Sequence, residues 1–228
     1  MSMDVQTTRE RICEIGRLLY SRNLTDASGG NISARSGKYI CMTPRHTGSE
    51  LHWNFEPHQV LVIDRQGIKV DGIGEFSREF KVHFQLYRDI SNGNAVIHCH
   101  APNVMVFCAA GIPLPPALEI SLVFGEIGFS DFASTDSQEL ADSITAEIQK
   151  KPDALKELAA AVMSPWHGLF VLGRTLDAAF DAVERIELNA RTLLMSSLLP
   201  GVDEKAAGLK KRIQQLKKES AKFNKPAD

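Results

Sequence analysis

Residues 94–100 read Asn-Ala-Val-Ile-His-Cys-His, a short apolar run that ends in two histidines separated by one residue. Successive side chains of an extended strand point to opposite faces, so the pattern predicts His98 and His100 on one face and Cys99 on the other. Two imidazoles on one face can bind a divalent metal ion. The pair alone is a weak signal, because two polar residues at a strand end would give the same pattern.

The composition is typical of a soluble globular protein and gives no electrostatic case for binding nucleic acid or a membrane. The chain has 228 residues, 43% of them apolar and 24% charged, and a net charge of −2. No apolar run approaches the roughly 20 residues that span a bilayer, and the polar N-terminus argues against a signal peptide. The four cysteines lack paired zinc-finger spacing, so we expect reduced thiols and a cytoplasmic protein.

Helical and strand patterns alternate along the chain, which predicts an α/β or α+β domain. Helices are expected at 4–22, from Ser77 onward, and at 102–110, 137–150 and 175–199; strands are expected at 38–43, 60–63, 68–70, 94–100, 159–163 and 169–172. We expect one domain over residues 1–202. The tail, 203–228, holds eight Lys/Arg and four Asp/Glu and predicts an amphipathic helix that docks on the body or on a neighbouring subunit.

Two loops combine glycine with hydroxyl side chains. Residues 26–33 read Asp-Ala-Ser-Gly-Gly-Asn-Ile-Ser, and residues 43–48 read Thr-Pro-Arg-His-Thr-Gly. Adjacent glycines let the backbone approach a ligand closely, and successive free amides can bind an anion. Each loop could equally be a polar turn between elements.

An open catalytic zinc site needs a third protein ligand. His167 is the best candidate, because it follows an apolar strand and precedes a glycine. Glu79 is expected in the first turn of the helix that begins near Ser77. The helix dipole alone would also favour a carboxylate there. His83, four residues later, is expected to pack rather than to bind a metal.

These residues together resemble a known family. Gly-Gly-Asn-Ile-Ser, Thr-Pro…Thr-Gly, Ser-x-Glu-Phe…His, His-x-His and a later His-Gly…Gly-Arg…Ala…Glu-x-x-Glu occur in the order seen in the class II aldolase/adducin family. The resemblance covers roughly residues 8–198. It implies a three-layer α/β/α sandwich with a central mixed, mostly antiparallel sheet, and a homotetramer with active sites at subunit interfaces.

The resemblance also implies roles for single residues. The metal ligands would be His98, His100 and His167, holding one Zn²⁺ per chain or another divalent ion such as Mn²⁺ or Co²⁺. Glu79 would be the catalytic glutamate that exchanges protons with the substrate. The phosphate of a small phosphorylated sugar would be bound by residues matching Gly30, Asn31, Thr47, Gly48 and Ser77.

Two positions differ from the family's aldolases. Glu119 stands where they have a tyrosine, and a glutamate at about this position resembles the acid/base of related dehydratases. Arg78 replaces the second serine of a phosphate-binding Ser-Ser pair, and it could bind a phosphate or carboxylate bidentately or lie on the surface. These differences leave the exact reaction open.

The expected function is a metal-dependent aldolase that cleaves a small phosphorylated ketose through a metal-stabilised enediolate. An epimerase, dehydratase or decarboxylase of the same family, acting on a related sugar phosphate or sugar acid, is the main alternative. The third is a non-catalytic, adducin-like interaction protein. The retained histidines and Glu79 argue against it.

Overall fold

The computed structural model describes residues 4–201 and Lys211, so the predicted tail helix and the boundary at 202/203 lie outside the described residues. A compact body ends at Ala190, and the last residues of the final helix belong to a second unit. The helices are α1 (Val5–Ser21), α2 (Phe80–Asp89), α3 (Pro102–Ala110), α4 (Gln138–Gln149), α5 (Pro152–Glu157) and α6 (Leu176–Ser196), with short 3₁₀ turns η1 (Pro57–Gln59) and η2 (Glu119–Phe124).

One seven-stranded sheet forms the centre of the body, in the order β4-β3-β2-β1-β5-β7-β6. Its strands are β1 (Asn31–Ser36), β2 (Tyr39–Met42), β3 (Leu61–Ile63), β4 (Lys69–Asp71), β5 (Ala95–Cys99), β6 (Ala159–Ser164) and β7 (Gly168–Gly173). Neighbouring strands all pair antiparallel. A mixed sheet was expected, but the parallel pairing is limited to an isolated bridge between Phe129 and Met163.

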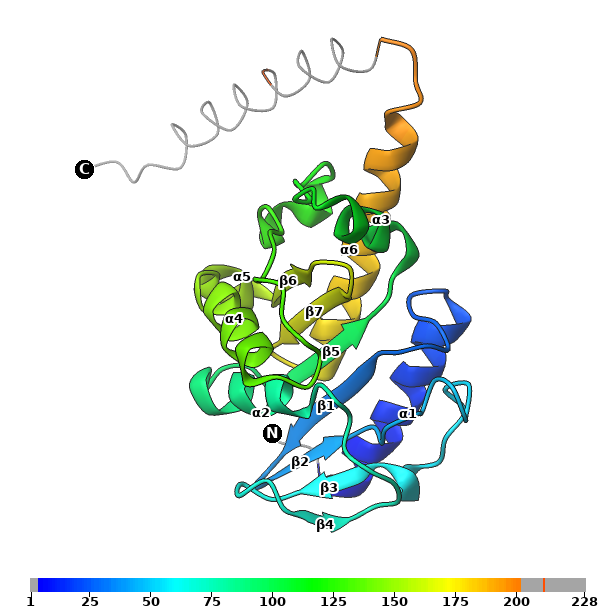
Figure 1. Ribbon diagram of the computed structural model, residues 1–228, viewed down its shortest axis with the longest axis vertical. Coiled ribbons are helices and arrows are strands. Elements are labelled where there is room, and N and C mark those ends of the chain that lie inside the picture. Colours follow the sequence, from blue (N-terminus) through cyan, green and yellow to red (C-terminus); the bar gives the residue numbers. More distant parts are fainter. Residues whose placement is uncertain (1–3, 202–210, 212–228) are drawn as a thin grey trace, which may run out of the picture. The chain divides into compact units, whose positions relative to one another are not determined.

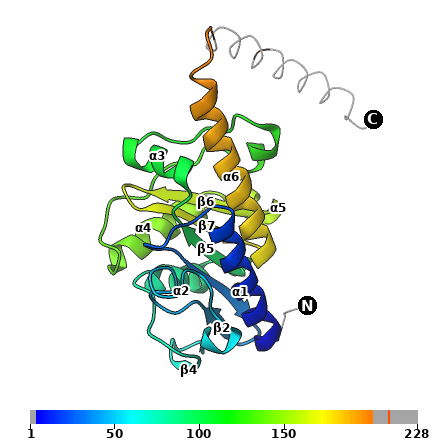
Figure 2. The same ribbon diagram turned by 90° about the vertical axis from the view of Figure 1, so that its right-hand side faces the viewer.

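Helices cover both faces of the sheet, which confirms the three-layer architecture. Figures 1 and 2 show α1 and the first turns of α6 on one face, with α2 and α4 on the other. Alternate strand residues serve the two layers: Met42, Val96 and Phe170 join Val82 and Leu140 in one apolar cluster. Because strand side chains alternate, His98 projects from the same face as Val96, towards the layer that contains α2.

The helix α1 illustrates how local signals set an element. The Asp4 carboxylate accepts a hydrogen bond from the Thr7 amide and caps the helix. Ile12, Ile15 and Leu19 recur at helical spacing and are fully buried. Burying each of these side chains contributes about 1.5–3 kcal/mol to folding.

The predicted elements are confirmed, with three differences. Strand β1 begins at Asn31, inside the stretch interpreted as a polar loop, and the short helix α5 was not predicted. Helix α2 begins at Phe80 rather than near Ser77. Glu79 therefore occupies the N-cap position instead of the first turn, and its side chain makes no capping hydrogen bond.

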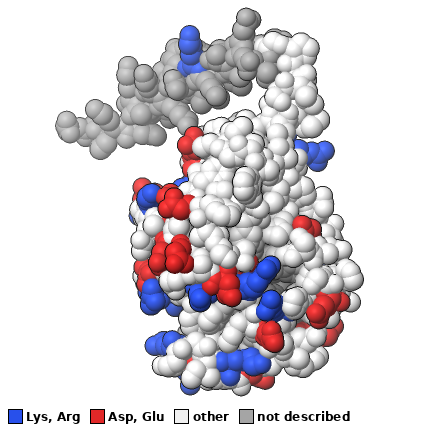
Figure 3. All heavy atoms as spheres, in the orientation of Figure 1, with Lys and Arg blue, Asp and Glu red and all other residues white. Residues whose placement is uncertain are grey.

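On the face shown in Figure 3, acidic and basic side chains are interspersed over the lower part of the body. Among the described residues, no helix combines the length and hydropathy that a membrane crossing requires. All four cysteines are buried and none forms a disulfide.

Candidate metal centre and active site

The sheet brings three histidines together from two strand ends. His98 lies in β5, His100 follows this strand directly, and His167 lies in the turn between β6 and β7. Because β5 pairs with β7, with His98 opposite Phe170, the turn that carries His167 comes beside the end of β5. One potential ligand atom from each histidine lies within 4.8 Å of the others, so the group could hold a metal ion.

His98 and His100 each have one ring nitrogen, Nε2, that makes no hydrogen bond and could bind a metal. His98 Nδ1 lies 3.1 Å from the Leu169 carbonyl oxygen, and His100 Nδ1 lies 3.3 Å from Asp26 Oδ1. A carbonyl and a carboxylate only accept hydrogen bonds, so each Nδ1 carries the proton and each Nε2 keeps its lone pair. Both Nε2 atoms, and Nδ1 of His167, are buried without a hydrogen-bond partner. Such groups are costly to leave unpaired, and a bound metal would satisfy them.

Burial also favours the neutral form of His98 and of His100. It lowers the pKa of His98 well below its ordinary value, and the neighbouring His167 and His100 lower it further. Burial likewise lowers the pKa of His100, although Asp26 opposes this effect. A neutral imidazole is the form that binds a metal, so these ligands need not release a proton near pH 7.

Glu79 lies at the edge of the histidine group and is held by two side chains. Its Oε2 accepts hydrogen bonds from Asn31 Nδ2 at 2.9 Å and from Ser77 Oγ at 2.7 Å. Its Oε1 lies 3.5 Å from His167 Nε2. This carboxylate therefore points at the histidines rather than at the amides of α2, which favours the catalytic interpretation over a helix-dipole role.

The Glu79 carboxylate is ionised despite its burial. Burial raises its pKa, but the contact with His167 and the hydrogen bond from the Ser77 hydroxyl lower it more, so the pKa lies well below its ordinary value. An ionised carboxylate with fixed orientation can accept a proton from a substrate carbon or hydroxyl.

The histidines and Glu79 open into a pocket of about 410 Å³. Its lining comprises Ser28, Gly29, Gly30, Pro44, Arg45, His46, Thr47, Gly48, Ser49, Ser77, Arg78, Glu79, His98, His100, Thr135 and His167. Of the residues expected to bind the substrate phosphate, only Asn31 is absent from this lining; it is buried and donates to Ser77 and Glu79 instead.

Another part of the pocket lining, here called the cationic end, is basic and polar. Arg45, His46, Ser49 and Arg78 have exposed side chains there. Arg45 lies 3.6 Å from the Glu75 carboxylate, whereas Arg78 makes no hydrogen bond or ion pair with another described residue. Its guanidinium is available to an anion.

The glycine-rich loop differs from the expected amide cradle. The amides of Ser28 and Gly29 both donate to Asp26 Oδ1, at 2.8 and 3.1 Å, so these two amides are not free for an anion. At these two amides the structure matches the alternative of a polar turn. Gly29 instead lets the loop backbone lie close to the His100 ring: a Cβ on Gly29 would lie 2.4 Å from His100 Cε1. Gly168 likewise leaves room for the rings, because its Cβ would lie 3.0 Å from His98 Cε1.

Glu119 lies outside the pocket that most of the other candidate residues line. It is exposed at the start of η2 and does not line the pocket described above. Within one chain, its expected acid/base role has no geometric basis, and it would have to act on the site of another copy.

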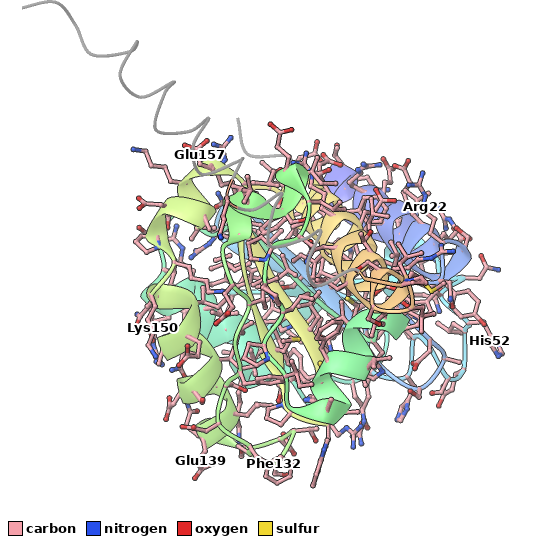
Figure 4. The ribbon with its side chains drawn as sticks, turned by 90° about the horizontal axis from the view of Figure 1, so that it is seen from above. Arg22, His52, Phe132, Glu139, Lys150 and Glu157 are labelled. Atoms are coloured by element: carbon pink, nitrogen blue, oxygen red, sulfur yellow. The ribbon has the colours of Figure 1, made fainter. Side chains whose placement is uncertain are left out.

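Several residues near the site carried no sequence signal of their own. Asp26 contacts His100, and Thr135 lines the pocket from the loop before α4. On the same loop, Phe132 is 70% exposed and packs edge to face on Trp166, which precedes His167; Figure 4 shows Phe132 at the edge of the molecule. Only contacts between distant segments identify these residues.

Comparisons with known proteins agree with this geometry. The family model described as "Class II Aldolase and Adducin N-terminal domain" matches residues 10–194. The chain is 27% identical to an L-fuculose phosphate aldolase of Methanococcus maripaludis over 179 residues, which cover 76% of this chain and 89% of the relative. It is 26% identical to a 5-deoxy-D-ribulose 1-phosphate aldolase of Bacillus thuringiensis over 193 residues, covering 83% and 85%.

A solved structure shares the fold. The structure of an L-fuculose 1-phosphate aldolase superposes with a TM-score of 0.74 at 22% identity, covering 90% of this chain and 96% of the other. The match of the family model to most of the chain, together with this fold, shows that the protein belongs to the class II aldolase/adducin family.

Proposed function

We propose that the protein is a metal-dependent aldolase that cleaves a small phosphorylated ketose. One observation carries this proposal: three convergent histidines with unpartnered nitrogens adjoin an ionised carboxylate, in a pocket whose other end is cationic. The two relatives described above are named as aldolases of sugar phosphates, which supports the same substrate class.

The histidines His98, His100 and His167 would hold one divalent ion. An all-imidazole donor set suits Zn²⁺, and it also accepts Co²⁺ or, more weakly, Mn²⁺. When bound, the ion supplies Lewis-acid stabilisation of the enediolate that carbon–carbon cleavage leaves.

Glu79 transfers the proton at the substrate carbon. Asn31 and Ser77 hold its Oε2, so the carboxylate has one defined orientation and Oε1 faces the histidines. General acid–base catalysis by such a group contributes about 10²–10⁴-fold to the rate.

The substrate phosphate binds to the pocket lining formed by Gly30, Thr47, Gly48 and Ser77, together with Arg78, which supplies an unpaired guanidinium. Anchoring the phosphate away from the reacting bond fixes the orientation of the sugar. Asn31 contributes by holding Ser77 and Glu79.

Glu119 reaches a site from a neighbouring copy in a homo-oligomer, which we propose to be a tetramer. Its segment exposes the apolar side chains of Ile120 and Leu122, and α3 with the turn after it exposes Val106 and Ile112. A second copy would cover such side chains. Mixing the inactive variants Glu119→Gln and His98→Ala, with subunit exchange, tests this arrangement. Random mixing would restore about a quarter of the sites. If the mixture stays as inactive as its components, Glu119 does not act across an interface.

A panel of ketose phosphates, incubated with metal-replete protein, tests the reaction. Release of dihydroxyacetone phosphate or glycolaldehyde phosphate supports the aldolase. Loss of water or carbon dioxide, or inversion at one carbon, identifies the second candidate function: a dehydratase, decarboxylase or epimerase. Glu119 favours this second candidate, because an acid/base carboxylate stands where the family's aldolases carry a tyrosine.

A further inference from the structure

The glycine-rich loop is built around a single carboxylate oxygen that also contacts a candidate metal ligand. Asp26 Oδ1 accepts three hydrogen bonds: from the Ser28 amide at 2.8 Å, from the Ser28 hydroxyl at 2.8 Å and from the Gly29 amide at 3.1 Å. The same oxygen lies 3.3 Å from His100 Nδ1, across 74 residues of sequence. The loop thus fixes the carboxylate in place, and the carboxylate meets His100.

The backbone of Asp26 is fixed from the other side by Trp53. The indole Nε1 of this fully buried tryptophan donates to the Asp26 carbonyl oxygen at 2.9 Å. Gly29 completes the arrangement, because any side chain there would collide with the His100 ring. Three independent features therefore hold the contact between Asp26 and His100.

We propose that Asp26 is a positioning residue, which orients the His100 imidazole and its tautomer so that Nε2 faces the metal position. The inference rests on the proposed metal site. A carboxylate that accepts a hydrogen bond from the second ring nitrogen fixes the ring and raises the basicity of the metal-binding nitrogen. His98 receives the equivalent support from a backbone carbonyl, that of Leu169, which no side-chain substitution removes. Asp26 is thus an outer partner of His100 that mutation can test.

The test measures Zn²⁺ affinity by competition with a chromophoric chelator. Asp26→Ala should weaken Zn²⁺ binding about 10- to 100-fold, the usual effect of losing such a partner. Asp26→Asn keeps an acceptor for both amides and for His100 but loses the charge. Charge-assisted hydrogen bonds are about twice as strong as neutral ones, so Asn should weaken binding by only about 3- to 10-fold.

Asp64→Ala is the matched control. Asp64 Oδ1 accepts the amides of Gln66 and Ile68 in the turn between β3 and β4, a similar loop outside the pocket lining. This variant should bind Zn²⁺ like the wild type. A proton NMR spectrum of the Zn²⁺-loaded protein gives a second readout: Asp26→Ala should lose the protected Nδ1–H signal of His100 and keep that of His98.

The outcomes separate this inference from the proposed function. If the wild type binds Zn²⁺ and His98→Ala does not, but both Asp26 variants bind as tightly as the wild type, the positioning role is overturned and the metal site stands. If the wild type itself fails to bind Zn²⁺, the metal site is overturned and the role of Asp26 with it. If Asp26→Ala does not fold, the Asn variant decides, because it retains the loop's hydrogen bonds.

Discussion

The two ends of the pocket are built in different ways. At the histidine end, His98 and Glu79 are buried and every orientation is fixed by a partner: a backbone carbonyl, an asparagine and a serine. At the cationic end, Arg45 and Arg78 are exposed on loops, and Arg78 has no partner among the described residues. Groups with a fixed orientation suit the bond-breaking step, whereas exposed cations suit an anion that needs only to be held.

The largest expected effect is at the histidine end. His98→Ala should reduce bound metal to well below one ion per chain and lower activity by at least about 100-fold, more than the loss of an outer-shell partner. Metal analysis and turnover of the same preparation check both effects. His58→Ala, at an exposed histidine in η1, is the control and should change neither. Retention of metal by the His98 variant would contradict the assigned ligand set.

Glu79→Gln should separate chemistry from metal binding. The amide keeps the size of the carboxylate but cannot accept the proton, so turnover should fall at least about 100-fold while the metal stays bound. Glu139→Gln is matched to it, because Glu139 lies in the first turn of α4 and can serve only the helix dipole. Normal turnover of the Glu79 variant would show that Glu79 is a helix-terminal charge alone.

At the cationic end, Arg78→Ala should change binding more than chemistry. Losing an exposed charge-assisted contact should raise KM for a phosphorylated substrate about 10-fold and leave kcat nearly unchanged. Arg88→Ala is the control, because Arg88 is exposed in the last turn of α2 and pairs with Asp89. A fall in kcat with KM constant would place Arg78 at the reacting bond and remove the contrast between the two ends.

The interior behind the histidine end should make stability depend on pH. His83 is fully buried, and burial lowers its pKa to about 3, although the Glu79 charge opposes this. Between about pH 6.5 and pH 3, His83 is protonated in the unfolded chain but not in the folded chain. Stability contributed by His83 therefore falls on acidification, by up to about 1.4 kcal/mol per pH unit.

Denaturant unfolding between pH 7 and 5 checks this slope. His83→Gln should flatten the decrease, although it costs stability at pH 7 because His83 Nδ1 and Ser33 Oγ are hydrogen-bonded at 2.7 Å. His58→Gln, at an exposed position, should leave the slope unchanged. An unaltered slope in the His83 variant would mean that other groups dominate the acid sensitivity.

Local patterns in the sequence determined much of this protein. The alternation in 94–100 placed His98 and His100 on one face, because strand side chains alternate whatever the rest of the chain does. Helical spacing located α1 and α4. The choice of His167 rested on its similar place at a strand end, and the pairing of β5 with β7 made that place adjacent.

Only the tertiary structure decided what surrounds those ligands. The contact between Asp26 and His100 joins residues 74 positions apart, and that between Asn31 and Glu79 joins residues 48 apart. No periodicity encodes such pairs, because they depend on how separate elements pack. The same reason explains two features that the sequence did not reveal: Asp26 accepts hydrogen bonds from two of the loop amides, and Glu119 lies away from the pocket of its own chain.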